Sequence, residues 1–236
     1  SGDAVTDADE SVAVGYNSLS SNTLGNRTVA IGTGALRDMN FTTATDSFNT
    51  AVGHSAGLVV TTGEQNTLIG ALAGDALTTG DNNVAIGYEA LSTEDAHGDN
   101  VAVGYQSLKT FNAGADAFCT AVGYQSGTCL TTGVQNTFVG ALCGDGVDDG
   151  YGNVAMGYEA LSANCGNENV AIGKRALLVS TANSNTAVGF ESLEANTSGY
   201  YNTSVGYQNL NANTEGLHST GIGHNALYAA TTGGYN

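Results

Sequence analysis

An acidic, glycine-containing turn is the segment whose residue types best match cation chemistry. It reads Asp145-Gly-Val-Asp148-Asp149-Gly, so three carboxylates fall within five residues. Carboxylate oxygens at such short spacing suit Ca²⁺. A solvated acidic turn explains the same residues, and the equivalent segment 70 positions earlier, which begins at Asp75, lacks the other two acids. We therefore expect no cofactor, and the alternative is a Ca²⁺ site at the three aspartates.

Two insertions supply the candidate ligand-contacting residues. They lie around 37–48 and 109–118, where the spacing of an otherwise regular pattern lengthens. Insertions in repeat proteins loop out on one flank and often touch ligands, although a neutral surface loop is the alternative. The candidates for ligand contact are Arg37, Asn40, Phe41, Lys109, Phe111 and Asn112.

Catalytic chemistry has no support in the residue pattern. The four histidines form no Ser-His-Asp arrangement with neighbouring residues. Glycine motifs at Gly32 and Gly221 resemble dinucleotide-binding loops, but they fall on a short repeat and lack a strand–loop–helix context. We predict that the protein is not an enzyme.

The elements that must position these residues are short repeats. A five-residue core, [N/S/T/C]-[V/T]-A-[V/I]-G, recurs thirteen times in steps of mostly 16 or 17 residues. A fixed period this short indicates one small unit stacked many times. The core ends at Gly15, Gly32, Gly53, Gly70, Gly87, Gly104, Gly123, Gly140, Gly157, Gly173, Gly189, Gly206 and Gly223.

The core predicts one short strand in each coil. The residue three before the core Gly is always Val or Thr, and the residue directly before it is Val, Ile or Met, usually with Ala between them. Such alternation of β-branched residues is typical of a strand. We expect the β-branched side chains to face the interior, together with the Leu that often follows the Gly by four residues. Asn, Ala and Gly then occupy the opposite face.

These patterns predict an all-β fold, a parallel β-solenoid (β-roll) of about thirteen 16–17-residue coils with no helix longer than two turns. Residues 1–10 form an acidic lead-in, and 11–236 form a single repeat domain. Within that domain, 49–118 and 119–188 match each other as a four-coil superrepeat. Asn stands four before the core Gly in nine coils, so we expect its amides to stack in a hydrogen-bonded ladder.

The Ala face is predicted to be an inter-subunit contact, because a row of small side chains lets another backbone approach closely. Ala102 and Ala121 represent that face. The expected partner is another copy of the chain.

Coils four and eight replace this Ala with Leu68 and Phe138. If the strand keeps its register, both side chains face outward, and exposed apolar patches usually need a partner. We therefore place them in the interface. Leu72 and Leu142 are unusual for their position too, and a local shift that brings them inward would replace the Leu that Gly74 and Gly144 have displaced.

Charge excludes several partners. The chain has 22 acidic and 5 basic residues, for a net charge of −17. Nucleic acid needs clustered Lys and Arg, and an anionic membrane surface would repel this chain. No run of 18 apolar residues is present, so we expect no membrane insertion. Four cysteines allow disulfides in an oxidising compartment, with undetermined pairing.

The units NVAIGYEALS, NVAVGYQSLK, NTAVGFESLE and NTSVGYQNLN resemble repeats of bacteriophage tail fibres and related bacterial surface proteins. They are similar, more distantly, to the head repeats of trimeric autotransporter adhesins. The resemblance implies extracellular trimeric fibres, on a virion tail or a cell surface, that attach to cells.

The expected function is therefore a non-enzymatic extracellular fibre module that mediates attachment to a cell surface. One alternative is a structural filament subunit without a receptor. Another is an ice-binding solenoid, which needs a flat Thr/Val face turned outward; an inward-facing Val/Ile row argues against it.

Overall fold

The computed structural model describes residues 2 and 9–236, which fall into two compact units that divide between Phe118 and Cys119. The unit boundary coincides with the start of the second superrepeat. Most of the acidic lead-in predicted at 1–10 lies outside the described residues.

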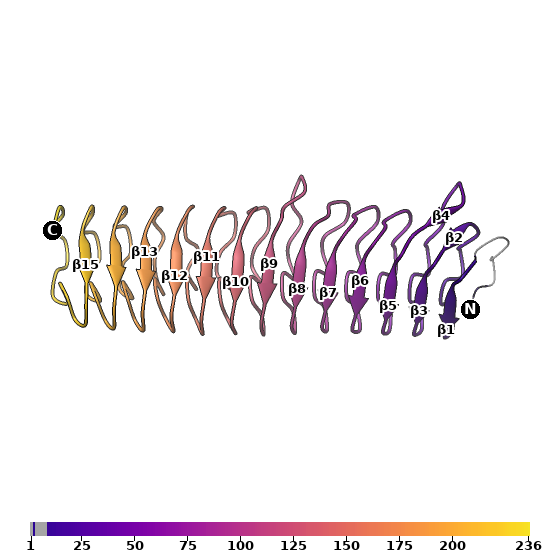
Figure 1. Cartoon of the computed structure of the whole chain (residues 1–236), viewed down its shortest axis with the longest axis horizontal. Coiled ribbons are helices and arrows are strands. Elements are labelled where there is room, and N and C mark those ends of the chain that lie inside the picture. The colour runs from indigo at the N-terminus through magenta and orange to yellow at the C-terminus, as the bar shows by residue number, and fades with distance from the viewer. Residues whose placement is uncertain (1, 3–8) are drawn as a thin grey trace. The chain divides into compact units, whose positions relative to one another are not determined.

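Both units are parallel β-solenoids, which confirms the predicted fold class (Figure 1). Each coil contributes one three-residue strand, and neighbouring strands pair in parallel register, with Ala30 opposite Ala51 and Ala171 opposite Ala187. No helix occurs among the described residues, so none there could span a membrane. The first unit contains β1 (Val12–Val14), β2 (Gly25–Asn26), β3 (Val29–Ile31), β4 (Thr45–Asp46), β5 (Thr50–Val52), β6 (Thr67–Ile69), β7 (Val84–Ile86) and β8 (Val101–Val103). The second contains β9 (Thr120–Val122), β10 (Thr137–Val139), β11 (Val154–Met156), β12 (Val170–Ile172), β13 (Thr186–Val188), β14 (Thr203–Val205) and β15 (Thr220–Ile222).

The two faces of the strands are the reverse of the prediction. The central residue of the strand is buried, and both Ala102 and Ala121 have no exposed surface. The residues on either side, most of which are β-branched, face outward, as at Val154, which is 36% exposed, and at Met156, which is 45% exposed. Ala102 and Ala121 are therefore interior residues, and their assignment to an interface was wrong. The coil is thin, so small Ala side chains fit inside it while bulkier ones stand on the outer surface.

Leu completes the interior, as predicted, from a tight turn. Leu161 and Leu177 are fully buried four residues after their core Gly. Each has a left-handed backbone, with φ of 57° and 51°, which costs about 1–2 kcal/mol for a residue with a Cβ. Burial of the Leu side chain, worth about 1.5–3 kcal/mol, offsets this cost.

The core Gly is required by both conformation and space. Gly157 has φ of 131°, and a Cβ there would lie 2.8 Å from the backbone of Gly173 in the next coil. That backbone cannot move away without breaking the ladder that joins the coils. Only glycine therefore fits at this place in each coil.

A column of buried Asn side chains joins and closes the coils, which confirms the predicted ladder. Asn169 Oδ1 accepts the backbone N–H of Asn185 at 3.0 Å, and its Nδ2 donates to the carbonyl of Ala182 at 2.9 Å. The first bond links consecutive coils, and the second ties the strand to the turn that closes its own coil. Where the column has Cys119 instead of Asn, its Sγ contacts the carbonyl of Gly133 at 3.4 Å, so the closing contact is kept.

Coils four and eight fill their interior by an exchange of side chains. Leu68 and Phe138 are fully buried, so their assignment to an interface was wrong. A Cβ on Gly74 would lie 2.8 Å from Leu68, and one on Gly144 would lie 2.8 Å from the Phe138 ring. The large strand residue therefore occupies the space that the turn Leu fills elsewhere.

The suggested inward shift of Leu72 and Leu142 is also wrong. Both remain half-buried, in left-handed turn positions with φ of 60° and 54°. Their backbone conformation is the usual one for the residue two after the core Gly, so the strand and the turn keep their register.

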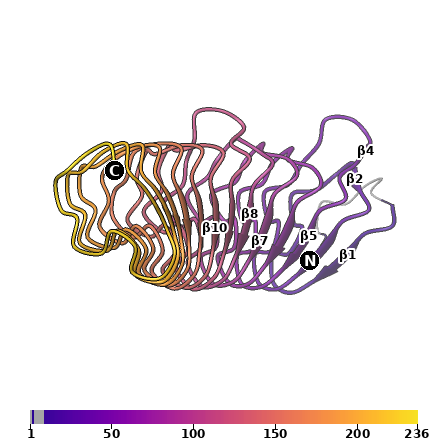
Figure 2. The same ribbon diagram turned by 60° about the vertical axis from the view of Figure 1, so that its left-hand side comes forward.

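The first insertion is an ordered part of the fold. Its β4 pairs in parallel with β2, which places Thr45 opposite Gly25. Met39 is fully buried, and Phe41 is 6% exposed. Figure 2 shows β2 and β4 beside each other at one end of the first unit. The insertion thus supplies both backbone pairing and core side chains, which a freely looping segment would not.

The Asn ladder can be tested with Asn169→Ala. The change leaves the Asn185 N–H and the Ala182 carbonyl without partners in the interior. We expect the free energy of unfolding to fall by roughly 2 kcal/mol or more, since a buried unsatisfied group costs about 1–3 kcal/mol. Urea denaturation measures this, and Asn164→Ala, at an exposed turn, is the control. Equal effects of the two changes would contradict the ladder.

The side-chain exchange can be tested by a double-mutant cycle at Phe138 and Gly144. Phe138→Ala should cost about 3–5 kcal/mol by leaving a cavity, and Gly144→Leu alone should destabilise by colliding with the ring. Together they recreate the arrangement of Ala155 and Leu161, so we expect the double variant to recover at least 1 kcal/mol relative to additivity. Additive losses in urea denaturation would show that the two positions do not share one space.

Candidate functional site

The outward surface of the strands is the most regular exposed feature of both units. We call it the strand face. It consists of the first and third residue of each three-residue strand, and every one of these side chains is half-buried or exposed. In the first unit they are Val12, Val14, Val29, Ile31, Thr50, Val52, Thr67, Ile69, Val84, Ile86, Val101 and Val103. In the second they are Thr120, Val122, Thr137, Val139, Val154, Met156, Val170, Ile172, Thr186, Val188, Thr203, Val205, Thr220 and Ile222.

The strand face is uncharged and mostly apolar. One column contains Val and Thr, and the other contains Val, Ile and Met. Neighbouring strands lie about 4.8 Å apart and alternate residues about 6.6 Å apart, so the side chains form a nearly rectangular grid. β-branched side chains are stiff at χ1, and contact with another surface costs them little entropy. The geometry therefore suits contact with a flat partner.

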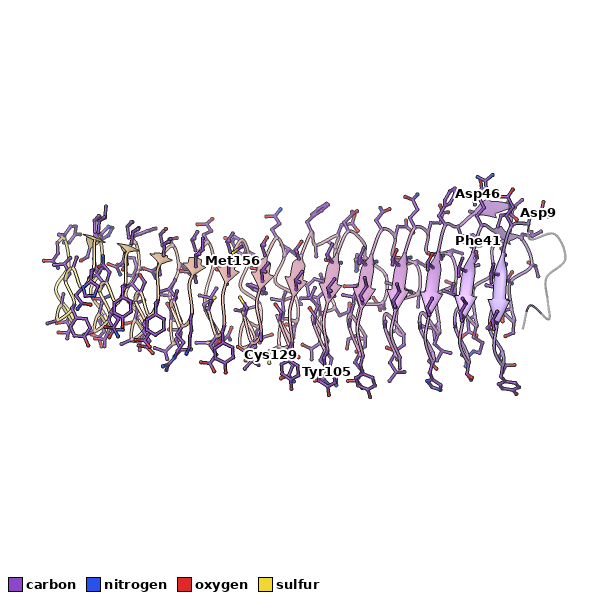
Figure 3. All side chains as sticks on the ribbon, turned by 60° about the horizontal axis from the view of Figure 1, so that its bottom comes forward. Asp9, Phe41, Asp46, Tyr105, Cys129 and Met156 are labelled. Carbon is purple, nitrogen blue, oxygen red and sulfur yellow. The ribbon has the colours of Figure 1, made fainter. Side chains whose placement is uncertain are left out.

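An aromatic column follows the turn edge of each unit, one residue after the core Gly. In the first unit the rings of Tyr88 and Tyr105 stack at 5.6 Å. In the second unit Phe190 and Tyr207 stack at 5.2 Å, and Tyr207 and His224 at 5.1 Å. Figure 3 shows Tyr105 projecting away from the strands. The column lines the edge of the coil with exposed rings.

The first insertion does not present its predicted residues together. Phe41 lies in the core, where Gly25 leaves room for its ring. Arg37 is half-buried and pairs with Asp38 at 2.6 Å. Asn40 is exposed, and its Oδ1 accepts a bond from Thr23 at 2.7 Å. Of the three candidates, Asn40 alone is fully exposed.

The second insertion does not present its predicted residues together either. Phe111 is fully buried, and Lys109 pairs with Glu89 at 2.5 Å. Asn112 is exposed. The two insertions arise from different coils, one around β4 and the other after β8 (Figure 1). The proposal of a ligand site on the insertions is therefore wrong for Phe41 and Phe111, whose rings pack in the core.

The three aspartates of the acidic turn do not bring their carboxylates together in the structure. Asp148 and Asp149 are exposed, and Asp148 Oδ1 accepts the Thr131 hydroxyl at 2.5 Å. Asp145 is half-buried, and its Oδ1 has no hydrogen-bond partner. Burial raises the pKa of Asp145, and the negative charge of Glu159 raises it further. Asp145, Asp148 and Asp149 are not among the groups of potential metal ligands that converge within the described residues.

The group that does converge, within the part of the chain described here, is Glu94, Asp95 and His97, whose ligand atoms lie within 4.8 Å of one another. Glu94 is fully buried, and its Oε1 accepts the backbone N–H groups of Asp95 and His97, both at 3.1 Å. Its Oε2 accepts the N–H of Ala113 at 3.2 Å. Glu94 therefore holds the turn by hydrogen bonds, as Asn22 does in its own coil. The sequence analysis missed it because no repeat position requires an acid there.

The four cysteines form no disulfide. Cys129 is exposed, whereas Cys119, Cys143 and Cys165 are buried. Burial raises the pKa of Cys143 and of Cys165 to about 12, so these two thiols stay protonated at neutral pH. They behave as small core residues.

No family model matches this chain, and the comparisons with curated proteins and with solved structures found no match. Function must therefore be inferred from the surfaces described above.

Asp145 provides a pH-dependent test of the acidic turn. The pKa of Asp145 is raised above the ordinary value of 3.8. Protonated Asp145 therefore contributes fully to the stability of the folded chain below pH 3.8, and this contribution is lost as pH rises through the folded-state pKa. At neutral pH, Asp145→Asn should therefore raise the thermal midpoint by a few degrees, and the gain should shrink in acid. Asp149→Asn, which removes an exposed carboxylate, is the control.

The measurement is thermal unfolding with EDTA and with excess CaCl₂. A lower midpoint for Asp145→Asn, together with stabilisation by Ca²⁺ of the parent chain but not of the variant, would support a calcium site at the acidic turn.

Proposed function

We propose that the chain is a non-enzymatic extracellular fibre module that self-associates through the strand face and serves attachment to a cell surface. The observation that carries the proposal is the strand face itself. It is mostly apolar, uncharged and at least partly exposed on every coil of both units. Large exposed apolar surfaces in soluble proteins mark interaction sites.

A second copy of the chain fits this surface well. Each copy presents the same two columns, so strand faces can meet with matching spacing along the stack. Closed cyclic symmetry is the usual outcome for self-association of identical chains, and a trimer is the form that the repeat resemblance implies. The net charge of −17 resides outside the strand face, where it would keep the other surfaces apart.

Attachment is supported by the repeat type and by the exposed turn edges. A coil needs its Gly, Asn, Ala and Leu for folding, but its turn residues can vary without disturbing the ladder. Turn residues are therefore available for contact with a glycan or protein receptor on a virion tail fibre or a cell-surface fibre. Association would multiply any such contact through avidity.

Ice binding is a second candidate, and the outward direction of the strand face favours it. An inward Val/Ile row was the argument against it, and that row faces outward. A flat grid of Thr methyl, Val and Ile groups could order water in rows. Thermal hysteresis of the purified chain, lost on placing charge in the strand face, is the result that ice binding predicts and self-association does not.

The proposal is tested by Val154→Lys combined with Met156→Lys, two exposed residues of β11. We expect the parent chain to sediment at the mass of three chains, and the variant to sediment as a monomer, because buried unpaired charges oppose contact. Tyr151→Lys with Asn164→Lys adds the same charge at exposed turn positions and should leave the trimer intact.

Retention of labelled protein on bacterial cells with different surface polysaccharides measures attachment. The monomeric variant should be retained at least tenfold less than the control variant. A monomeric parent chain, or equal retention of both variants, would contradict self-association as the basis of attachment.

A further inference from the structure

A hollow on the turn edge of the second unit has the features of a ligand site. It lies over the turns that precede β13 and β14 and has a volume of about 370 Å³, within the range of about 300–1,000 Å³ typical of small-ligand pockets. Its lining comes from two successive coils. The lining residues are Thr181, Ala182, Asn183, Ser198, Tyr200 and Tyr201.

Two tyrosines form an aromatic corner in the hollow. The rings of Tyr200 and Tyr201 meet edge to face, with centroids 5.2 Å apart and planes at 76°. Tyr201 continues into a column with His218 and Tyr235, at centroid distances of 5.1 and 5.0 Å. Tyr200 and Tyr201 are 41% and 56% exposed. The corner therefore exposes ring faces to a ligand, and His218 of the following coil packs against the Tyr201 ring.

Polar groups around the corner are free to bind. Asn183 Oδ1 accepts the backbone N–H of Asn167 at 2.8 Å, which fixes the amide and leaves its Nδ2 to donate elsewhere. Among the described residues, the hydroxyls of Ser198, Tyr200 and Tyr201 have no hydrogen-bond partner. A ligand with several hydroxyl groups could pair with all four.

The backbone beneath the hollow is held rigidly. The carbonyl of Gly199 accepts bonds from Asn185 and Asn196, both at 2.8 Å and both from fully buried side chains. The Thr214 carbonyl in the next coil accepts the N–H of Ser198 at 3.1 Å. Ser198 and Tyr200 flank this fixed carbonyl, so the site exists before a ligand arrives and little ordering cost arises on binding.

Charge narrows the ligand class. None of the six lining residues is charged, and the chain as a whole is strongly acidic. Anionic ligands are therefore disfavoured, and no carboxylate lines the hollow to attract a cation. Ring faces together with free amide and hydroxyl groups match the apolar C–H face and the hydroxyl groups of a neutral sugar ring.

We propose that this hollow binds a neutral pyranose sugar of a cell-surface polysaccharide. For its biological meaning the inference rests on the attachment function proposed above, and it names the receptor class. Sugar binding itself does not require the strand face, because all six lining residues come from turns of one chain. Binding by one hollow should be weak, and copies of the chain would add avidity.

The test is saturation-transfer difference NMR of the full chain with the methyl glycosides of glucose, galactose and N-acetylglucosamine, and with sialyllactose as the anionic probe. We expect at least one neutral glycoside to bind. Tyr200→Ala with Tyr201→Asn should weaken that binding at least tenfold; Asn at 201 tolerates the left-handed backbone, with φ of 58°. Phe190→Ala with Tyr207→Ala removes an aromatic pair outside the hollow and should bind like the parent.

Circular dichroism and thermal midpoints show whether both variants are folded, and Asn183→Ala is a milder variant that should also weaken binding. Binding by none of the neutral probes, equal binding by the tyrosine variant, or preference for sialyllactose would overturn the proposal. Cell retention separates the two proposals. If parent and tyrosine variant adhere equally, the sugar site fails and attachment stands. If the parent binds sugar but not cells, attachment fails and the sugar site stands.

Discussion

A buried side-chain amide, present in nine of the thirteen coils, is the interaction on which the rest of the structure depends. Asn66 illustrates it: its Oδ1 accepts the N–H of Asn83 in the next coil at 2.9 Å, and its Nδ2 donates to the carbonyl of Gly80 at 2.8 Å. The amide thereby satisfies a backbone group of the neighbouring coil and one of the turn that closes its own coil. An apolar residue could do neither. The interior must therefore stay narrow enough for this side chain to span it.

A narrow interior explains both the small core and the exposed strand face. Ala is the usual strand residue inside, and Leu from the turn fills what remains. The larger β-branched residues still favour an extended backbone, but they stand outside. Binding chemistry is then confined to the strand face, the insertions and the turn edges. Of these, the strand face is the most uniform and the turn edges are the most varied, which is why we propose assembly through the first and recognition through the second.

Much of this architecture could be predicted from the sequence, because repetition reveals strand positions, Leu turns and Asn columns directly. Which face of each strand points into the interior could not be predicted. A period of two separates the faces but does not identify the inner one, and the usual preference of Val and Ile for the core pointed the wrong way. The absence of Leu at Gly74 and Gly144 was a readable sign that Leu68 and Phe138 belong inside, since an interior space left empty in register must be filled.

The candidate sites were harder to predict. Phe41 and Phe111 occur in insertions, yet they pack inside because an insertion that stays ordered needs its own core residue. Tyr200 and Tyr201 gave no regular signal, because their hollow forms where turns of neighbouring coils meet. Residues 17 or so apart lie side by side in a solenoid, and the Tyr201–His218 contact follows this rule. A comparison of residues about 17 positions apart in the sequence would have found this aromatic contact.

The most direct test of the account is thiol labelling of Ala171→Cys under native conditions, read by peptide mass spectrometry. Ser204 occupies the equivalent position in β14 and is fully buried, so one additional heavy atom fits there. The account predicts that a maleimide modifies the exposed Cys129 and reaches the thiol introduced at position 171 only after unfolding. Native labelling at position 171 as fast as at Cys129 would show that the Ala face is the outer one, and would contradict the interior, the strand face and the assembly that we propose.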